Sequence, residues 1–403
     1  MQRRDFLRSS ALASSLLLVP KFLHALDRGP GLARLRDAQG RRLIVVQLSG
    51  GNDGLNTIIP YQNDLYYKSR PTLAIKPTEG ILTMNDELGL HPAMRGLKGL
   101  YDQGQLAVLN SVGYPNPDRS HFRSMDIWQT GSAADQNLST GWLGRYLDSN
   151  CAGCDHPYTG LELDDTLSLA LKGEARKGLA LKNPAKLRQL ISNRYVAAVS
   201  HADHPHEAHA EVDYLYKTLA ETTSSAQYLY EKSKIYKSSV EYPDTSFGKS
   251  LKTTGELINS GIESRVFYVA LSGFDTHVRQ QPQQQRLLGE LADGLAALAN
   301  DLRQKGEWDN TRVLVFSEFG RRVGQNASNG TDHGTANNVL LLGGSLRRAG
   351  VLNAAPNLTD LDQGDLRFQV DFRSIYAAVL KDWLGADDAG ILGTDFARLP
   401  LLG

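Results

Sequence analysis

Acidic, histidine and hydroxyl side chains follow four of the predicted strands, and a further acid and histidine lie in a glycine-rich loop. Ser120 comes directly before a segment that is predicted to be helical. The free amide groups and the positive dipole end of a helix N-terminus stabilise an anion or an alkoxide nucleophile. Groups of these types that converge at one end of a sheet predict an active site. The members of the set are Asp53, Ser120, His121, Asp275, His277, Glu318, Asp332 and His333.

The elements that must position these side chains alternate along the chain. Apolar, β-branched runs that read as strands buried on both faces lie at residues 42–48, 106–110, 265–271, 311–316 and 340–342. Helical patterns lie at residues 91–103, 183–239, 284–305 and 372–383. This alternation predicts an α/β fold with a mostly parallel central sheet covered by helices on both faces. We expect a single domain over residues 40–403 that carries a helical insertion at residues 175–255.

Each of these side chains also has a structural explanation when it is considered alone. Ser120 could serve as a helix N-cap, and Asp275 and Asp332 could be turn residues. Glu318 could be the first-turn acid of a helix, and a single histidine is often a partly buried, hydrogen-bonded side chain. These explanations do not account for polar groups at four strand ends that converge in space. The convergence therefore favours a functional site.

Composition and charge exclude several classes of protein. The chain has 403 residues, with 44 Lys and Arg against 44 Asp and Glu, so the formal net charge is zero. A nucleic-acid binder that works by counterion release would carry a basic surplus or a basic block, and neither is present. Hydrophobic residues at 41% and charged residues at 22% are typical of a globular protein.

The N-terminal segment resembles an export signal. Arg3 and Arg4 precede a Phe-Leu pair, an apolar run follows at residues 11–19, and small residues near Ala25 offer a cleavage site. This order predicts a twin-arginine signal peptide over residues 1–26, read by the twin-arginine translocase. The run is too short to span a bilayer, so the mature protein is not expected to be an integral membrane protein. A periplasmic or secreted bacterial protein is predicted. The alternative, a basic amphipathic helix of a cytosolic protein, would not need the paired arginines.

Two further features have competing interpretations. Cys151 and Cys154 could close a small disulfide loop in an oxidising compartment, but a zinc ribbon would need a second pair of cysteines. A structural or incidental role is favoured over a redox site because the flanking residues indicate a loop. The histidine-rich tract at residues 201–209 lies among polar residues at the start of the predicted insertion, where a solvated segment is favoured over a metal site.

Several blocks of the sequence resemble the bacterial DUF1501 family, which is grouped with the alkaline phosphatase-like superfamily. The resemblance covers almost the whole chain after the signal segment, in order. It implies a three-layer α/β/α fold of the alkaline phosphatase and sulfatase type, with a metal-dependent site at the strand ends. The blocks that carry it lie at residues 48–61, 70–71, 119–122, 140–145, 273–277, 317–321, 331–334 and 370–385.

The resemblance also implies roles for individual residues. Ser120 is similar to the nucleophile of the superfamily, and Arg119, Arg321 or Arg322 would hold the ester oxygens. A second metal site of the superfamily often uses an Asp-His pair, but here Phe319 follows Glu318, so His121 is expected to supply the imidazole. The implied metal ligands are Asp53, His121, Asp275, His277, Glu318, Asp332 and His333. One or two divalent ions are expected, with zinc favoured for the mixed ligands and manganese, iron, magnesium or calcium as the other choices.

The implied function is hydrolysis of phosphate or sulfate esters, with Ser120 or metal-bound water attacking the ester centre of an anionic substrate. One alternative is a non-catalytic exported binding protein on the same scaffold with a structural metal. This alternative is supported by Phe319, which stands where the superfamily often has a metal-binding histidine. The other is an esterase of the SGNH type, because residues 50–53 match its Gly-x-Asn-Asp block. That class also needs a Gly-Asp-Ser block earlier in the chain, and this sequence has none there.

Overall fold

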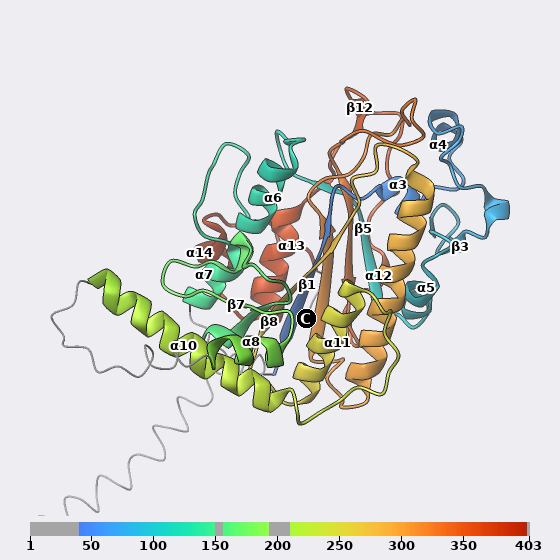
Figure 1. Cartoon of the computed structure of the whole chain (residues 1–403). Helices are drawn as coiled ribbons and strands as arrows, with labels where there is room; N and C mark the ends of the chain where they lie inside the picture. The colour runs from blue at the N-terminus through green and yellow to red at the C-terminus, as the bar shows by residue number, and fades with distance from the viewer. Residues whose placement is uncertain (1–39, 150–155, 193–209, 401–403) are drawn as a thin grey trace, which may run out of the picture. The chain divides into compact units, whose positions relative to one another are not determined.

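The computed structural model describes residues 40–149, 156–192 and 210–400, and residues 42–403 form one compact unit (Figure 1). The predicted signal peptide over residues 1–26, the two cysteines and the histidine-rich tract at 201–209 lie outside the described residues. In the part of the chain that is described, no helix has both the length and the apolar character needed to cross a membrane.

A nine-stranded sheet forms the centre of this unit, in the order β11-β5-β10-β9-β1-β8-β6-β7, with β14 also paired to β5. Only β10 runs antiparallel to its neighbours, so the prediction of a mostly parallel sheet is confirmed. The strands are β1 (Arg42–Ser49), β5 (Leu106–Gly113), β6 (Gly160–Glu162), β7 (Leu179–Ala180), β8 (Val266–Ser272), β9 (Thr311–Ser317), β10 (Asn337–Leu342), β11 (Gly350–Val351) and β14 (Val370–Asp371).

Helices cover both faces of the sheet, so the α/β/α layering is also confirmed (Figure 1). Strand β1 shows why: Ile44 and Val46 point into one apolar cluster, whereas Leu43 and Val45 point into the other. The first cluster is completed by α5 (Arg95–Asp102), α11 (Ser246–Asn259) and α12 (Gln280–Arg303). The second is completed by α6 (His121–Thr130), α7 (Trp142–Asp148), α13 (Phe372–Ala378) and α14 (Asp388–Leu392).

The remaining elements are the helix α10 and several short helices and strands. Residues 175–255, the predicted insertion, contain β7, α8 (Pro184–Ile191), α10 (Ala210–Lys232) and the first part of α11, and α11 packs against α12 and β8. A small sheet contains β2 (Ile58–Ile59), β4 (Gly89–Leu90) and β3 (Leu82–Thr83), and β12 (Leu361–Asp362) pairs with β13 (Asp365–Leu366). The other helical turns are α3 (Gly54–Thr57), α4 (Asp64–Ser69), 3-10 turns at Pro77–Glu79, Pro157–Thr159 and Leu169–Leu171, and a π-helix at Val379–Trp383.

The register of the central strands places three loops side by side. Ser49 at the end of β1 is paired with Ser272 at the end of β8, and Leu48 is paired with Ser317 at the end of β9. These parallel strands therefore release their following loops at the same edge, where ligands bind in open α/β sheets. The residues predicted to form the site lie in these loops and in α6.

Candidate metal centre

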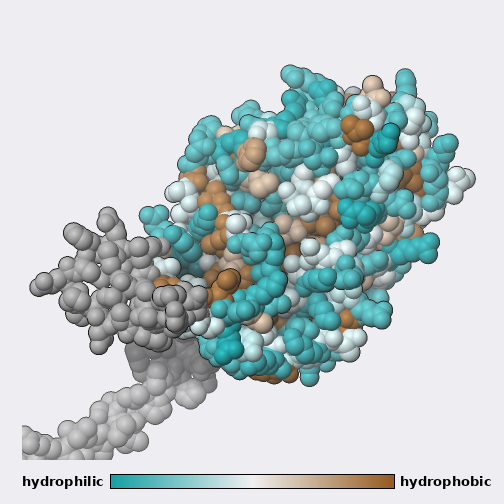
Figure 2. Space-filling model, in the orientation of Figure 1, coloured by the Kyte–Doolittle hydropathy of each residue, from teal (hydrophilic) through white to brown (hydrophobic). Residues whose placement is uncertain are grey.

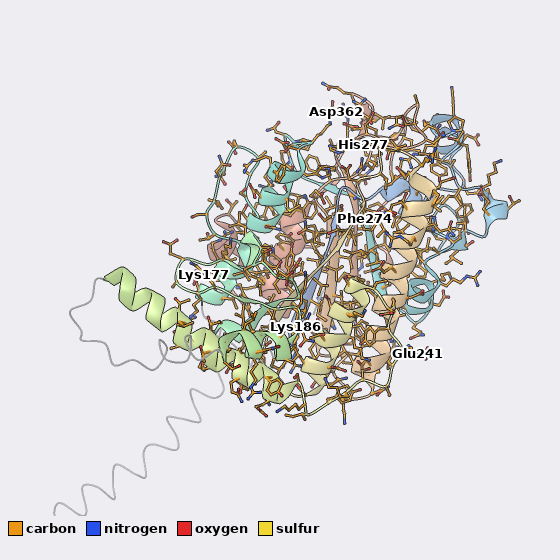
Figure 3. All side chains as sticks on the ribbon, in the orientation of Figure 1. Lys177, Lys186, Glu241, Phe274, His277 and Asp362 are labelled. Carbon is orange, nitrogen blue, oxygen red and sulfur yellow. The ribbon has the colours of Figure 1, made fainter. Side chains whose placement is uncertain are left out.

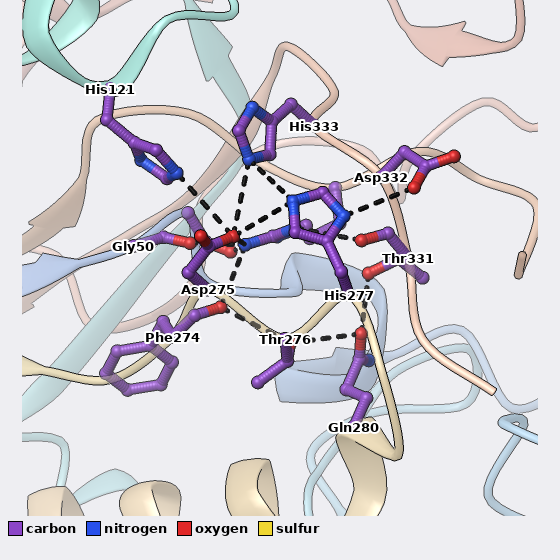
Figure 4. Close-up of polar contacts among 12 residues, drawn as sticks. Gly50, His121, Phe274, Asp275, Thr276, His277, Gln280, Thr331, Asp332 and His333 are labelled. Atoms are coloured by element: carbon purple, nitrogen blue, oxygen red, sulfur yellow. Dashed lines mark hydrogen bonds and ion pairs between the residues drawn. The ribbon is translucent and has the colours of Figure 1, made fainter. Parts of the chain in front are cut away.

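Three imidazoles converge on one carboxylate oxygen at this edge of the sheet (Figure 4). The Oδ1 atom of Asp275 lies 3.1 Å from Nε2 of His277, 3.3 Å from Nε2 of His333 and 3.6 Å from Nε2 of His121. Asp275 and His277 follow β8, His121 begins α6, and His333 belongs to the glycine-rich loop before β10. The structure therefore brings together four of the residues predicted from the sequence.

Two of the rings are held from behind by carboxylates. Nδ1 of His121 lies 2.8 Å from Oε1 of Glu318, and Nδ1 of His277 lies 3.2 Å from Oδ1 of Asp332. A carboxylate behind Nδ1 places a proton on that nitrogen and leaves Nε2 with a lone pair. Glu318 and Asp332 were predicted to bind metal directly, but the structure places them behind the rings, where they orient the imidazoles.

The third ring is held by a backbone carbonyl. Nδ1 of His333 lies 2.8 Å from the carbonyl oxygen of Arg119, and a carbonyl can only accept, so Nδ1 donates and Nε2 of the neutral ring carries a lone pair. That lone pair faces Nε2 of His277 at 2.9 Å and Oδ1 of Asp275 at 3.3 Å. Lone pairs that face one another repel, so this arrangement requires a cation between them: a proton or a metal ion.

The geometry and chemistry of these atoms fit a divalent metal. The ligand atoms of His121, Asp275 and His333 all lie within 4.8 Å of one another. Tetrahedral zinc with bonds of about 2.0–2.1 Å separates its ligand atoms by roughly 3.3 Å. The observed separations from Oδ1 of Asp275 bracket that value, and a carboxylate with imidazoles is a ligand set that zinc favours. These residues therefore form a possible metal site, with His277 directly beside it.

The charges around the group also favour a cation. Burial opposes ionisation of Asp275, but the hydrogen bond and positive charge of Arg321 outweigh it and lower the pKa of this carboxyl to about 2. The hydrogen bond to Glu318 raises the pKa of His121, whereas burial lowers the pKa of His333. The carboxylates of Asp275, Glu318 and Asp332 each contact an imidazole, while Arg321 pairs with Asp275 and Arg322 lies near Asp332. The carboxylates favour a bound cation, and the guanidiniums offset part of that effect.

Arg321 was predicted to contact the ester, but its guanidinium is buried. It ties together the loops after β1 and β8 and the loop before His333, and its Nη2 also donates to Oδ1 of Asp275 at 2.7 Å. Such a buried guanidinium positions Asp275 and offers no open face to a ligand. The backbone carbonyls that accept its hydrogen bonds belong to Gly50, Gly51, Phe274 and Thr331.

Two glycines make this close packing possible. Gly50 and Gly51 have φ values of 116° and 71°, which favour glycine. A Cβ atom on Gly50 would lie 2.4 Å from the amide nitrogen of Asp275, and one on Gly51 would lie 2.3 Å from the ring of Phe319. Phe319 in turn packs against the rings of His121 and His333, and its ring centroid lies 4.8 Å from the centroid of each.

Asp53 was predicted as a metal ligand, but the structure does not bring it into the group. Its Oδ2 atom lies 2.6 Å from Nη1 of Arg70, both side chains are fully buried, and the side-chain amide of Gln280 donates to the same oxygen. Among the described residues, Oδ1 of Asp53 is buried without a hydrogen-bond partner. Arg70 and Gln280 were not assigned roles from the sequence, because a long polar side chain gives no local sign of burial.

Ser120 and Arg119 lie at the start of α6. Ser120 is the exposed N-cap residue of this ten-residue helix, its amide donates to Oδ1 of Asp118 at 2.6 Å, and its hydroxyl makes no capping bond to the described helix. The Arg119 guanidinium donates to the buried carboxylate of Asp365, which also lies 3.4 Å from Arg322. Two guanidiniums on one carboxylate leave a positive charge at this edge. Nothing in the sequence pairs Asp365 with Arg119, because 246 positions separate them.

Comparison with solved structures finds remote likenesses. A lipoteichoic acid synthase, LtaP from Listeria monocytogenes, is 10% identical with a TM-score of 0.40, covering 89% of this chain and 75% of that one. The PsFucS1 sulfatase from Pseudoalteromonas sp. is 13% identical with a TM-score of 0.35, covering 90% and 71%. The C-terminal periplasmic domain of EcEptC from Escherichia coli, in complex with zinc, is 12% identical with a TM-score of 0.35, covering 75% and 72%.

Comparison with curated proteins finds no match to the sequence. A family model does match residues 40–383, which is most of the chain, and its description is "Protein of unknown function (DUF1501)". The match includes all the residues that form the possible metal site. The chain therefore belongs to the DUF1501 family.

Proposed function

We propose that the chain is an exported, metal-dependent hydrolase of phosphate or sulfate esters on an alkaline phosphatase-like scaffold. The observation that carries the proposal is the set of three imidazoles, each held at Nδ1, whose Nε2 atoms face one oxygen of Asp275. A divalent ion bound there, zinc in the first instance, supplies Lewis acidity to an ester oxygen and lowers the pKa of a nucleophilic hydroxyl.

The residues of the chain supply the rest of the chemistry. Ser120 is next to His121 at the N-terminus of α6, where the helix dipole and free amides favour an alkoxide over a neutral hydroxyl. Its hydroxyl, or a water molecule, would give up its proton and attack phosphorus or sulfur, and the bond to the ester oxygen would break so that the organic group leaves as an alcohol. Where Ser120 attacks, a water molecule would then release phosphate or sulfate from the serine oxygen. Arg119 and Arg322 share Asp365, and the excess positive charge attracts the anionic ester to this edge of the sheet.

Orientation of the imidazoles is the second contribution of the chain. Glu318 is fully buried, and its Oε1 atom accepts from the amide of Gly50 as well as contacting Nδ1 of His121. The carboxylate is therefore fixed to the loop after β1, and it fixes the ring in turn. Rings that are held before the ligand arrives lose little freedom on binding it, which favours tight binding.

The proposed location rests on the N-terminal segment. Twin-arginine export moves folded proteins, which suits a chain that must assemble a metal site from residues 121 to 333 before it crosses the membrane. We propose that the mature protein acts in the periplasm or outside the cell.

Turnover by the metal-loaded protein tests the proposal. Hydrolysis of aryl phosphates and aryl sulfates is measured for the wild type and for Ser120→Ala, with Ser239→Ala as an exposed serine control in a loop away from the site. We expect turnover that a chelator abolishes, and loss of turnover in Ser120→Ala with its metal retained. Full turnover by Ser120→Ala assigns the attack to water, and turnover that survives chelation refutes the metal-dependent mechanism and favours a serine esterase.

A non-catalytic binding protein with a structural metal is the second candidate. It is favoured by two positions that would carry metal ligands in the superfamily that the sequence resembles. Asp53 would ligate a metal there but pairs with Arg70 here, and Phe319 stands where the second metal would have a histidine. Stoichiometric metal in a wild type that hydrolyses none of the phosphate or sulfate esters would support this candidate over the hydrolase.

A further inference from the structure

Phe319, whose ring packs against two of the imidazoles, also lines a pocket of 280 Å³. Its walls come from the loop after β5, the β12–β13 hairpin and the segment just before β10. Figure 3 places Asp362 of this hairpin at the same end of the unit as His277. The lining has charged members, Asp118, Asp362 and Arg367, and apolar or aromatic members that include Tyr114, Trp128, Phe319, Ala336, Leu366 and Phe368.

The pocket and the metal ligands are built from the same segments. Phe319 lines the pocket, and its ring centroid lies 4.8 Å from those of both His121 and His333. Asp118 lines the pocket one residue before Arg119, whose carbonyl holds His333. The pocket therefore adjoins the imidazole group through Phe319 and through residues 118–119.

Apolar side chains supply part of the pocket surface, beside the charged side chains of Asp118, Asp362 and Arg367. The face drawn in Figure 2 is mostly hydrophilic, with apolar side chains in small separate patches. Phe368, which lines the pocket, is nevertheless 37% exposed. A large apolar side chain that is exposed inside a pocket offers contact surface to an apolar group.

We propose that this pocket binds the organic group of the ester, and that this group is an uncharged aryl ring or short branched alkyl chain. The inference rests on the proposed function and names its substrate class. A volume just below the usual 300–1,000 Å³ of small-molecule pockets holds one ring system and excludes a polymer segment.

Trp128 offers no open ring face to a cation. The faces of Trp128 are covered by Phe316 at 4.8 Å and Phe372 at 4.3 Å, both nearly parallel to it. A cation is attracted to an open ring face, whereas the edge of a ring is positive. Trp128 therefore contributes apolar surface to the pocket and no cation-binding face.

Inhibition of the metal-loaded protein by pairs of non-hydrolysable ligands tests the proposal. Phenylphosphonate and methylphosphonate share the anionic group and differ in the organic group, and benzenesulfonate and methanesulfonate form the matching sulfur pair. The variant Phe368→Ala removes one wall of the pocket, and Phe122→Ala removes an exposed phenylalanine that does not line it. We expect Phe368→Ala to weaken the phenyl ligand about tenfold, to leave the methyl ligand within about twofold, and Phe122→Ala to change neither.

Three results would overturn the proposal. Equal weakening of the phenyl and methyl ligands by Phe368→Ala would show a structural role for this side chain. Weakening of the phenyl ligand by Phe122→Ala alone would place the organic group on the exposed rim outside the pocket. If both variants still hydrolyse esters and the inhibition constant of the phenyl ligand is unchanged in both, the pocket does not bind the organic group, although the proposed hydrolase activity is retained. If the metal-loaded wild type neither binds these anions nor hydrolyses esters, both the pocket proposal and the proposed function are wrong.

Discussion

Replacement of Asp53 by asparagine separates a structural role from a metal-binding role at this position. Oδ2 of Asp53 pairs with Arg70 at 2.6 Å, and the side chains of both residues are 0% exposed. Asparagine keeps the shape and one acceptor oxygen but removes the negative charge. We expect Asp53→Asn to destabilise the fold and to leave the metal content unchanged, because the nearby metal-ligand group does not include this residue.

The size of the effect follows from what remains around Arg70. Breaking a fully buried ion pair costs about 3–5 kcal/mol. In the variant, the guanidinium still donates to the carbonyls of Val323 and Arg322 and to Oδ1 of Asn56. These bonds offset part of the loss, so we expect the lower end of the range, about 3 kcal/mol in the free energy of unfolding. Because neither group is exposed, solvent screening does not reduce this value.

Urea unfolding of the chelated protein, followed by fluorescence and by circular dichroism, measures the loss without a contribution from metal binding. Arg70→Met and the double variant complete a cycle, and the double variant should be more stable than the sum of the two single changes predicts, because it leaves no unpaired charge. Metal content is then measured on the folded, reloaded variants. A loss below about 1 kcal/mol, or loss of metal from Asp53→Asn, would refute the assignment of Asp53 to a structural ion pair.

Three further changes test other parts of the site and core. Glu318→Gln should weaken metal binding about 10–100-fold in a chelator competition, because it weakens the hold on Nδ1 of His121. Gly51→Ala should destabilise the fold and weaken metal binding together, because the new Cβ would collide with the ring of Phe319. Burial raises the pKa of Glu162 to about 7, so the folded protein keeps a proton that the unfolded chain loses near pH 4.5. The free energy of unfolding should therefore fall as the pH rises between these two values. Glu162→Gln should remove that part of the pH dependence, as measured by urea unfolding.

The central strands could be predicted because each is apolar on both faces. Residues 42–48, 265–271 and 311–316 correspond closely to β1, β8 and β9. Parallel strands release their loops at one edge, so the meeting of Asp275 with the histidines also followed from the pattern. Strands of two residues, such as β11 and β14, are too short to show a recognisable hydrophobic pattern. The apolar run of β10 predicts a strand but does not indicate that it runs antiparallel to its neighbours.

The partners of the buried polar side chains could not be predicted. Glu318 meets His121 across 197 positions and Arg70 meets the carbonyl of Val323 across 253, so neither contact is visible in local spacing. Arg321 is buried because the carbonyls of Gly50 and Gly51 point inward and need hydrogen-bond donors, which its guanidinium supplies. The sequence therefore indicates which groups converge, while the structure decides which of them face the centre and which hold the others.

The metal content of the purified protein decides whether the imidazoles around Asp275 hold an ion. Elemental mass spectrometry is applied to protein without a histidine tag, for the wild type and for an Asp275→Ala, His333→Ala double variant that keeps the 201–209 histidine tract. We expect about one divalent ion per wild-type chain and loss of that ion from the double variant. Metal absent from both proteins, or bound equally by both, would contradict it.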